Sequence, residues 1–297
     1  MTRRFLPSAS KLAFGLAAGL CVWPLGVARA ADAAADKSQY HLFHPTPRER
    51  MRELSTDRPD ETESPYTVDA GHFQIESDLI AYIHDHDTAE GADTVVDFWS
   101  VAAVNLKAGL LNWMDLQLVL DSYHHVITHD RLTGQKITQS GLGDLTTRLK
   151  MNVWGNDGGR TALAVMPFLM FPTNQDDLGG DHVEGGAILA LAVELPAAWG
   201  MGLMTEVDCA RNSEDTAYRA DFVNTISFSH DIWGNLGGYL EFFSLVSSES
   251  GTDWEGTFDL GLTYLLSDDI QLDAGINLGV TESAEDLNPF LGLSWRF

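Results

Sequence analysis

The chain has 297 residues and carries 43 acidic against 18 basic side chains, a formal net charge of −25. An acidic chain of this kind repels nucleic acid, because neutralising phosphate groups requires Lys and Arg. The composition therefore excludes nucleic acid as a partner.

The first 30 residues have the pattern of a secretory signal peptide. The basic start MTRR is followed by the apolar stretch LAFGLAAGLCVWPLGV and by the small-x-small site Ala28-Arg29-Ala30. Cleavage after Ala30 would remove Cys21 and leave only Cys209, so we expect export and no intramolecular disulfide.

Residues 31–70 are expected to form an irregular periplasmic segment. Pro59 and Pro65 disfavour helix and central strand, and the acids of TDRPDETESP keep the segment hydrated. Two interpretations stay open here: a flexible tail, or a plug that Arg58 ties to acids of a barrel lumen.

From residue 72 onward the sequence alternates with a period of two, as β-strands do. Between residues 144 and 153, for example, Leu145, Leu149 and Met151 share one face while Arg148 and Lys150 share the other. Candidate strands span residues 72–84, 94–108, 114–123, 142–154, 161–172, 184–195, 201–211, 219–231, 235–246, 254–265, 269–280 and 287–297. No stretch after residue 30 has the roughly 18 consecutive apolar residues of a membrane helix.

The connections between these strands alternate between short turns and longer loops, with the longest at 124–140 and 173–183. Aromatic residues recur near strand ends, where outer-membrane barrels have interfacial girdles. We therefore predict an all-β fold: a closed antiparallel transmembrane β-barrel of about 12 strands over residues 71–297. A soluble β-sandwich or lipocalin-like barrel is the alternative, but so many mid-strand charges opposite apolar rows disfavour it.

The segment STDRPDETESPYTVDAGHFQIESDL resembles the start of the family named for the MetA pathway of phenol degradation. VNLKAGLLNWMDLQL, GLGDLTTRLK, GYLEFF, LGLTYLLSDDIQLDAGINLGV and FLGLSWRF are similar to later parts of the same family, so the resemblance covers residues 55–297. It implies an outer-membrane transporter barrel for small, often aromatic, compounds, and it supplies no catalytic residues.

If the apolar rows face lipid, the polar rows line the lumen, and acids outnumber bases among them. The expected pore-lining residues are Glu76, Asp78, Asp97, Asp115, Asp121, Asp144, Arg148, Lys150, Glu206, Asp208, Glu241, Asp259, Asp273 and Arg296. A carboxylate-rich lumen favours cations or neutral solutes. The alternative is that acids and bases pair into a network that fills a narrow interior.

Histidines at 84, 86, 124 and 125 are weak candidates for metal ligands, since imidazole and carboxylate side chains lie close in sequence without a fixed ligand pattern. Solvated loop histidines are the simpler interpretation. The pairs Ser122 with His124 and Ser229 with His230 could belong to a lipid-modifying enzyme, but neither sits in a nucleophile motif.

The final strand ends on Phe297, with Leu291, Leu293 and Trp295 in the same lipid-facing row. In outer-membrane barrels generally, a last strand ending in Phe resembles the signal read by the barrel assembly machinery, so we expect Trp295 and Phe297 to form that signal.

Taken together, the sequence predicts a protein of the cell outer membrane, in contact with outer-membrane lipid, that lets small-molecule solutes cross passively. No cofactor and no enzymatic activity are expected. A structural or adhesive barrel without transport is the alternative, and a lipid-modifying enzyme is less favoured.

Overall fold

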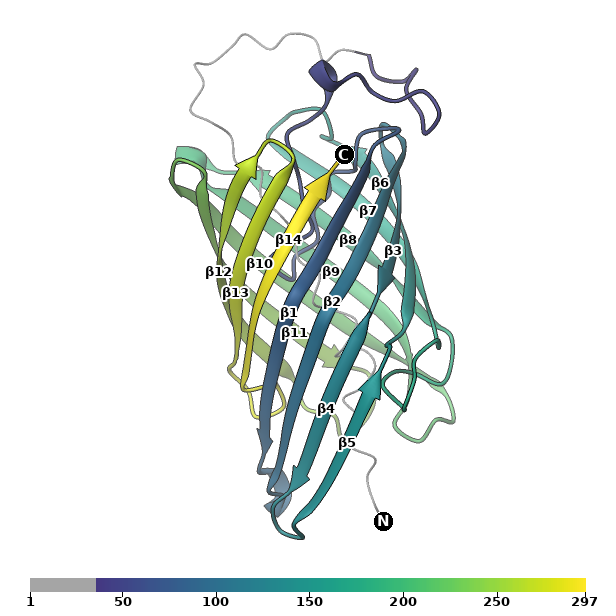
Figure 1. Ribbon diagram of the computed structural model, residues 1–297, viewed down its shortest axis with the longest axis vertical. Coiled ribbons are helices and arrows are strands. Elements are labelled where there is room, and N and C mark those ends of the chain that lie inside the picture. Colours follow the sequence, from purple (N-terminus) through teal and green to yellow (C-terminus); the bar gives the residue numbers. More distant parts are fainter. Residues whose placement is uncertain (1–35) are drawn as a thin grey trace.

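The computed structural model describes residues 36–297, and the predicted signal peptide, residues 1–30, lies outside them. Most of the described chain is β-strand (Figure 1). The strands are β1 (Phe73–Asp87), β2 (Thr94–Leu111), β3 (Met114–Leu120), β4 (Tyr123–Asp130), β5 (Gln135–Gly141), β6 (Leu145–Trp154), β7 (Thr161–Phe171), β8 (Glu184–Glu194), β9 (Gly200–Arg211), β10 (Tyr218–Trp233), β11 (Leu236–Ser247), β12 (Glu255–Ser267), β13 (Ile270–Gly279) and β14 (Leu287–Arg296). Three short 3-10 turns accompany them: η1 (Arg48–Arg50), η2 (Ala89–Gly91) and η3 (Pro196–Ala198). Over residues 36–297, no helix has the length and apolar content to span a membrane.

All strand pairings are antiparallel, and β1 pairs with both β2 and β14, which closes the sheet into a barrel. β3 and β4 lie one after the other along β2, so together they act as one interrupted strand. β6 pairs with β3 and β5 pairs with β4, so β5 and β6 together act as a second interrupted strand. The closed barrel therefore has 12 strands, and the predicted fold class is confirmed. Closure leaves no unpaired backbone edge in the lipid-facing region.

The predicted strand positions match the structure with one main exception. Residues 124–140, expected to be a long loop, form most of the hairpin β4–β5, which extends from the end of the barrel (Figure 1). The prediction was wrong because it looked for an apolar row. Strands pair through their backbones, and a polar segment containing Val126, Ile127 and Thr128 still forms a ladder.

The two ends of the barrel differ in their connections. Short turns at 112–113, 155–160, 195–199, 234–235 and 268–269 lie at the end where the chain terminates, which we call the short-turn end. The connections at 88–93, 131–134, 172–183, 212–217, 248–254 and 280–286 lie at the opposite, long-loop end. This asymmetry is typical of outer-membrane barrels.

The barrel is polar inside and apolar outside. Side chains such as Leu106, Leu118, Leu169, Phe222, Leu240, Leu260 and Leu291 are exposed on the outer face. Their sequence neighbours on the same strands, including Lys107, Gln117, Asp221, Glu241 and Asp259, are buried. The apolar outer face is what a lipid bilayer requires.

Alternation between the faces reverses once along the first strands. The β1–β2 ladder pairs Asp78 with Ala103 and then Ile80 with Val101, so it skips Leu79 and Ala102. Ala102 has a positive φ of 57°, a conformation typical of a β-bulge. Beyond this bulge Phe98 is buried inside, and the residues on either side of it therefore point outward.

Candidate functional site

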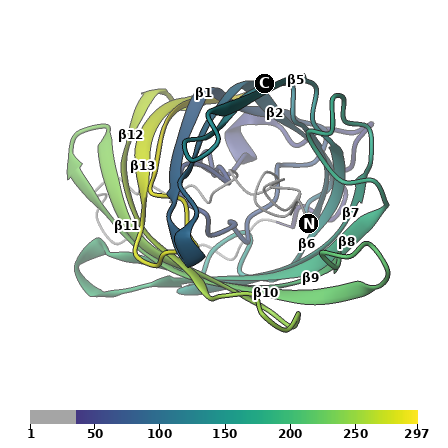
Figure 2. The same ribbon diagram turned by 90° about the horizontal axis from the view of Figure 1, so that it is seen from below.

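The site lies inside the barrel, where residues 54–70, which we call the inner segment, run through the lumen. The segment enters from the short-turn end and returns to it before β1 begins (Figures 1 and 2). Most of its side chains are buried. Its contacts reach β1, β2, β3, β6, β10, β11, β13 and β14, so the segment touches most of the wall.

Strands β1, β2, β3 and β6 form what we call the paired wall, because their charged groups are matched by charges of the inner segment. Asp57 accepts hydrogen bonds from the ammonium groups of Lys107 and Lys150. Lys107 also bonds Glu76, at 2.5 Å, and the backbone N–H of Asp57 donates to both oxygens of Glu76 at 3.1 Å. Asp57, Glu76, Lys107 and Lys150 thus each have a partner of opposite sign, the condition under which buried charges are tolerated.

Glu63 continues this pairing on β6. Its Oε1 accepts a hydrogen bond of 2.7 Å from Arg148, and Lys150 lies 3.9 Å from its Oε2. Both partners, Glu63 and Arg148, are almost fully buried. The ion pairs of Asp57 and of Glu63 therefore fix the inner segment against the paired wall.

Arg58 anchors the inner segment where the barrel closes. Its guanidinium bonds Asp78 at 2.5 Å and Asp273 at 2.8 Å, and it lies 5.5 Å from the centre of the Phe290 ring. Gly292 makes room for it, since a Cβ at that position would lie 2.2 Å from Arg58 Nη2. A buried arginine that bridges two carboxylates is costly to remove, because both acids would be left without a partner.

Strands β8–β12 form a different surface, which we call the open wall. Here the acids Glu241 and Asp259 face each other across β11 and β12, next to Asp60 and Glu61 of the inner segment. Among residues 36–297, none of these four acids takes part in an ion pair with Lys, Arg or His. Among the described residues, the inner segment donates hydrogen bonds to this wall from neutral groups, such as the Thr62 hydroxyl on Glu241 (2.5 Å).

Two of these acids titrate in the opposite sense to Asp57. Burial first, and the neighbouring Glu241 second, raise the pKa of both Asp60 and Glu61 well above the ordinary range. For Asp57, burial alone would raise the pKa, but the ammonium groups of Lys107 and Lys150 outweigh it and hold the pKa below its usual value. Within the inner segment, the ionised form of Asp57 is therefore stabilised by the lysines of the paired wall, whereas Asp60 and Glu61 are stabilised in their protonated forms beside the open wall.

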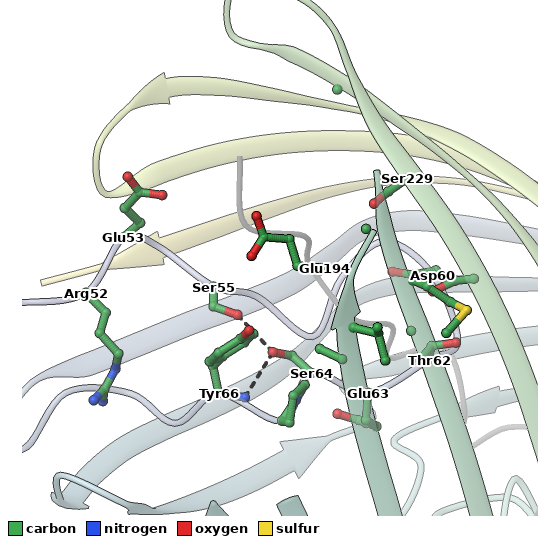
Figure 3. Close-up of a pocket in the computed structure, with 18 of the residues that line it drawn as sticks. Arg52, Glu53, Ser55, Asp60, Thr62, Glu63, Ser64, Tyr66, Glu194 and Ser229 are labelled. Carbon is green, nitrogen blue, oxygen red and sulfur yellow. Dashed lines mark hydrogen bonds between the residues drawn. The ribbon is translucent and has the colours of Figure 1, made fainter. Parts of the chain in front are cut away.

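Small inward-facing side chains leave space between the open wall and the inner segment. Ala192, Gly200, Gly202, Ser227, Ser229, Gly237 and Thr263 line a cavity of about 430 Å³ at the short-turn end. Figure 3 shows this cavity, with Asp60, Thr62 and Glu63 of the inner segment among its lining residues and Glu194 of β8 beside them. A volume of this size is in the range that holds a small organic molecule.

Nearer the long-loop end, the inner surface of β7–β11 includes an apolar strip. Met166, Ile188, Met204, Val223 and Leu245 form a buried cluster, with Phe168 and Phe243 packed against it. Met204 also accepts a hydrogen bond from the backbone N–H of Glu63, at 3.4 Å. An apolar strip inside the barrel thus leads to the inner segment on the same side as the cavity.

Comparison with known proteins identifies the family. The family model described as "Putative MetA-pathway of phenol degradation" matches residues 56–297. The chain belongs to this family. The match begins at Thr56, so this family's sequence pattern includes nearly all of the inner segment as well as the barrel, and the resemblance drawn from the sequence is confirmed.

The fold is shared with a solved outer membrane channel, and two further solved barrels are more distantly similar. The COG4313 outer membrane channel from Pseudomonas putida F1 is similar with a TM-score of 0.54 and 14% identity, covering 82% of this chain and 100% of that chain. The translocator domain of the autotransporter NalP from Neisseria meningitidis has a TM-score of 0.49 and 9% identity, covering 76% and 88%. The NanC porin also has a TM-score of 0.49 and 9% identity, covering 75% and 98%. A search of curated proteins found no match.

Within this family member, the structure brings most of the predicted pore-lining residues together inside the barrel. Asp78, Arg148, Lys150 and Asp273 meet the inner segment through ion pairs. Glu76 accepts hydrogen bonds from Asp57 N–H, Asp115 accepts one from Val68 N–H, and Glu241 contacts Glu61 and Thr62. Asp259 lies beside Glu241. Glu206 and Asp208 are buried side by side on β9, where their carboxyl groups contact each other.

Asp97 was wrongly placed in the lumen. Its carboxylate bonds the hydroxyl of Tyr82 (2.5 Å) and Nδ1 of His84 (2.9 Å), and Tyr82 packs against the exposed ring of Trp99. These residues lie on the outer face, opposite buried Phe98. The prediction failed because it assumed unbroken alternation along residues 94–108, whereas the bulge at Ala102 reverses the faces.

Three other predicted residues lie inside but hold the structure together. Asp144 accepts hydrogen bonds from the backbone N–H groups of Thr173, Asn174 and Gly180, and so folds the connection 172–183 against the barrel interior. Asp121 lies at the interruption between β3 and β4, where its carbonyl accepts the N–H of Gly143. Arg296 bonds Asp269 at 2.9 Å and the carbonyl of Arg52 at 2.9 Å, at the short-turn end.

The histidines do not converge on one site. His84 pairs with Asp97 and His86 with Asp93 (2.8 Å). His124 is instead buried with its ring 4.9 Å from that of Phe98, while His125 is the neighbouring residue and so points to the other face. In the described part of the chain, no group of three or more His, Cys, Asp or Glu residues could hold a metal ion.

The serine and histidine pairs also have separate partners. The Ser122 hydroxyl donates to the carbonyl of Leu120, while His230 bonds the carbonyls of Asp231 and Ala197. At the seam of the barrel, the backbones of Phe73 and Phe297 bond each other in both directions, and their rings stack at 6.0 Å. Trp295 and Phe297 are both exposed on the outer face.

Sequence reasoning left open whether the TDRPDETESP motif is a flexible tail or a plug tied by Arg58 to lumen acids, and it did not include Asp57, Asp60, Glu61 and Glu63 among the residues of the lumen. A signal was available in the walls, because Lys107 on β2 and Arg148 and Lys150 on β6, the two strands that flank β3, are bases whose charge needs buried acids. The apolar strip was missed as well, since an apolar residue on either face of a strand looks the same in sequence.

Proposed function

We propose that the protein is an outer-membrane channel through which small molecules pass without energy input. Its inner segment acts as a plug, and the short-turn end faces the periplasm. The fold and the family support a barrel of the outer membrane. The observation that carries the proposal is the difference between the two walls: the inner segment is fixed to one by buried ion pairs, while small side chains leave a cavity of about 430 Å³ on the other.

In this proposal solutes pass between the inner segment and the open wall. On that side the segment is held by few bonds, such as the contact between the hydroxyls of Thr62 and Thr225 at 2.6 Å. Such neutral hydrogen bonds each contribute about 0.5–1.5 kcal/mol, far less than removing a buried charge from its partner costs. The segment can therefore separate from the open wall while it stays attached to the paired wall.

The linings of this path indicate which solutes suit it. The apolar strip of β7–β11 favours molecules with a small aromatic or hydrophobic body. The unpaired acids of the open wall disfavour anions, because a ring of carboxylates raises their energy in the lumen. We therefore propose that neutral and cationic small molecules pass in preference to anions.

Planar-bilayer recording of the refolded protein tests the proposal. We expect discrete conductance with a reversal potential that shows cation preference in a salt gradient. The variant Arg58→Met should conduct more often, since it loosens the inner segment, and Arg131→Met, which alters an exposed base of the β4–β5 hairpin, serves as its control. Anion preference would contradict the acidic path.

A structural or adhesive barrel without transport is the second candidate, and one observation favours it. The inner segment touches most of the wall and its polar groups are largely bonded there, as expected for a permanently closed lumen. If neither the wild-type protein nor Arg58→Met conducts or passes a small solute into liposomes, this second function is the better account. We do not propose an enzyme, since the candidate Ser and His side chains bond elsewhere.

A further inference from the structure

The charged side chains that line the cavity at the short-turn end determine which solutes it can bind. The inference drawn from them rests on the proposed function. The cavity holds about 430 Å³ between the inner segment and strands β8–β12 (Figure 3). Acidic, basic and aromatic side chains all border it. What decides its preference is which of these groups are already neutralised by protein partners.

The three bases at the cavity are all neutralised. Lys37 and Arg52 both bond Asp157, at 2.7 and 3.0 Å. Arg296 bonds Asp269 at 2.9 Å. Each of these cations has an acid in direct contact, so none is available to attract an anionic ligand.

Four acids at the cavity have no such partner. They are Glu53, Asp60, Glu194 and Asp231, none of which forms an ion pair with a residue in the range 36–297. Asp60 is 1% exposed, and neither of its carboxylate oxygens has a hydrogen-bond partner among the described residues. A cation that enters the cavity would stabilise the ionised form of this buried acid, because an opposite charge offsets the cost of burying a carboxylate.

Aromatic rings border the same space. Tyr66 of the inner segment, Tyr239 of β11 and Trp199 of the β8–β9 turn line the cavity. Rings of this kind attract a cationic head group through their π faces and bury an apolar body. Carboxylates and aromatic rings together are the combination that recognises organic ammonium groups.

We propose that this cavity binds small organic cations, molecules in which an ammonium group is joined to a compact apolar or aromatic body, as they pass through the barrel. The described residues offer no cluster of three metal-ligating side chains, which is why the cation is an organic one. Neutral molecules of the same shape bind more weakly and anions are rejected.

Titration calorimetry on the full-length protein in detergent tests the proposal, with benzylammonium as the probe. Benzyl alcohol and benzoate serve as neutral and anionic probes of similar shape. We expect saturable binding of benzylammonium, weaker by a factor of about ten in Asp60→Asn, since one lost ionic contact is worth roughly 1.4 kcal/mol. The double variant Glu194→Gln, Asp231→Asn changes two acids at the ends of strands and should also weaken binding without affecting folding.

Asp253→Asn provides the control, because Asp253 is an exposed acid in the connection 248–254 at the opposite end of the barrel. Equal affinity for benzylammonium and benzyl alcohol, or unchanged affinity in both cavity variants, would overturn the proposal. Bilayer conductance of the same preparations distinguishes a failure of the channel function from a failure of the cation-binding cavity. Conductance without benzylammonium binding removes this inference alone, and binding without conductance removes the channel function while the binding site stands.

Discussion

The two walls of the lumen contain the same kinds of acid but surround them differently. On the paired wall Glu76 lies against Lys107, and on the open wall Glu241 lies against Asp259. The first arrangement fixes the inner segment in place through opposite charges, whereas the second leaves acids without cations next to a cavity. The difference shows how one barrel can hold an internal segment firmly against the paired wall and leave a cavity beside the open wall.

The largest effect should follow from removing the anchor at the seam. Arg58→Met leaves Asp78 and Asp273 buried without their cation, so we expect a loss of about 3–5 kcal/mol in the free energy of unfolding. Urea titration in detergent, followed by tryptophan fluorescence, measures it. Arg131→Met, which removes an exposed arginine 3.9 Å from Asp93, should change stability by less than about 0.5 kcal/mol. Equal stability of the two variants would mean that the inner segment is not anchored as described.

The same substitution on the two walls sharpens the comparison. Glu76→Gln removes the charge that bonds Lys107 at 2.5 Å and should cost about 1.5–3 kcal/mol of unfolding free energy. Glu241→Gln should cost less than about 1 kcal/mol, because the loss of the hydrogen bond from Glu61 N–H is offset by weaker repulsion from Asp259. A larger loss for Glu241→Gln than for Glu76→Gln would reverse the assignment of the walls.

Raising the pH should loosen the inner segment through the open wall. Asp60 and Glu61 have folded-state pKa values above their unfolded values of 3.8 and 4.5, so their stabilisation is complete below those values and is lost as pH rises through the raised ones. Asp57, whose pKa is lowered, loses stabilisation only below about pH 4. We therefore expect channel opening to become more frequent as the pH rises above the ordinary carboxyl values of 3.8 and 4.5.

The variant Asp60→Asn, Glu61→Gln removes both titrating groups and should flatten this pH response in bilayer recordings. An equally steep response in that variant would assign the pH dependence to other groups. Opening that becomes more frequent as the pH falls would contradict the sign.

The smallest effect should come from the acid that the bulge turns outward. Asp97→Asn should leave the reversal potential unchanged, because Asp97 bonds Tyr82 and His84 on the outer face. Asp259→Asn should reduce cation preference, because Asp259 is buried on the open wall. A shift in Asp97→Asn as large as that in Asp259→Asn would show that the solute path includes the outer hairpin face.

Much of the barrel could be predicted from the sequence because lipid imposes a strict rule. One face of each strand must be apolar, so alternation such as that of residues 145–153 reveals strands, their facing and their approximate ends. The rule weakens where the chain leaves the lipid, which is why the polar strands β4 and β5 were mistaken for a loop. It also gives a wrong result at a bulge, which the sequence does not reveal. There one extra residue exchanges the inner and outer faces of the strand and places Asp97 on the outer face.

The interior could be predicted only in part. The acids of β11–β13 were identified from their position in polar rows, but their surroundings depend on which strands become neighbours and on where the inner segment lies. Both the pairing of Asp57 with Lys107, 50 positions away in sequence, and that of Arg58 with Asp273, 215 away, depend on barrel closure. Local patterns contain no information on contacts at such separations.

Tethering the inner segment to each wall tests the central claim most directly. In a Cys209→Ser background, Thr62→Cys with Thr225→Cys links it to the open wall, where the two hydroxyl oxygens lie 2.6 Å apart. Thr67→Cys with Asn156→Cys links it to the β6–β7 turn beside the paired wall, where Asn156 Nδ2 and Thr67 Oγ1 are 2.8 Å apart. We predict that oxidation abolishes bilayer conductance in the first pair, with recovery on reduction, and leaves it unchanged in the second. Full conductance in the oxidised Thr62–Thr225 pair would contradict the account.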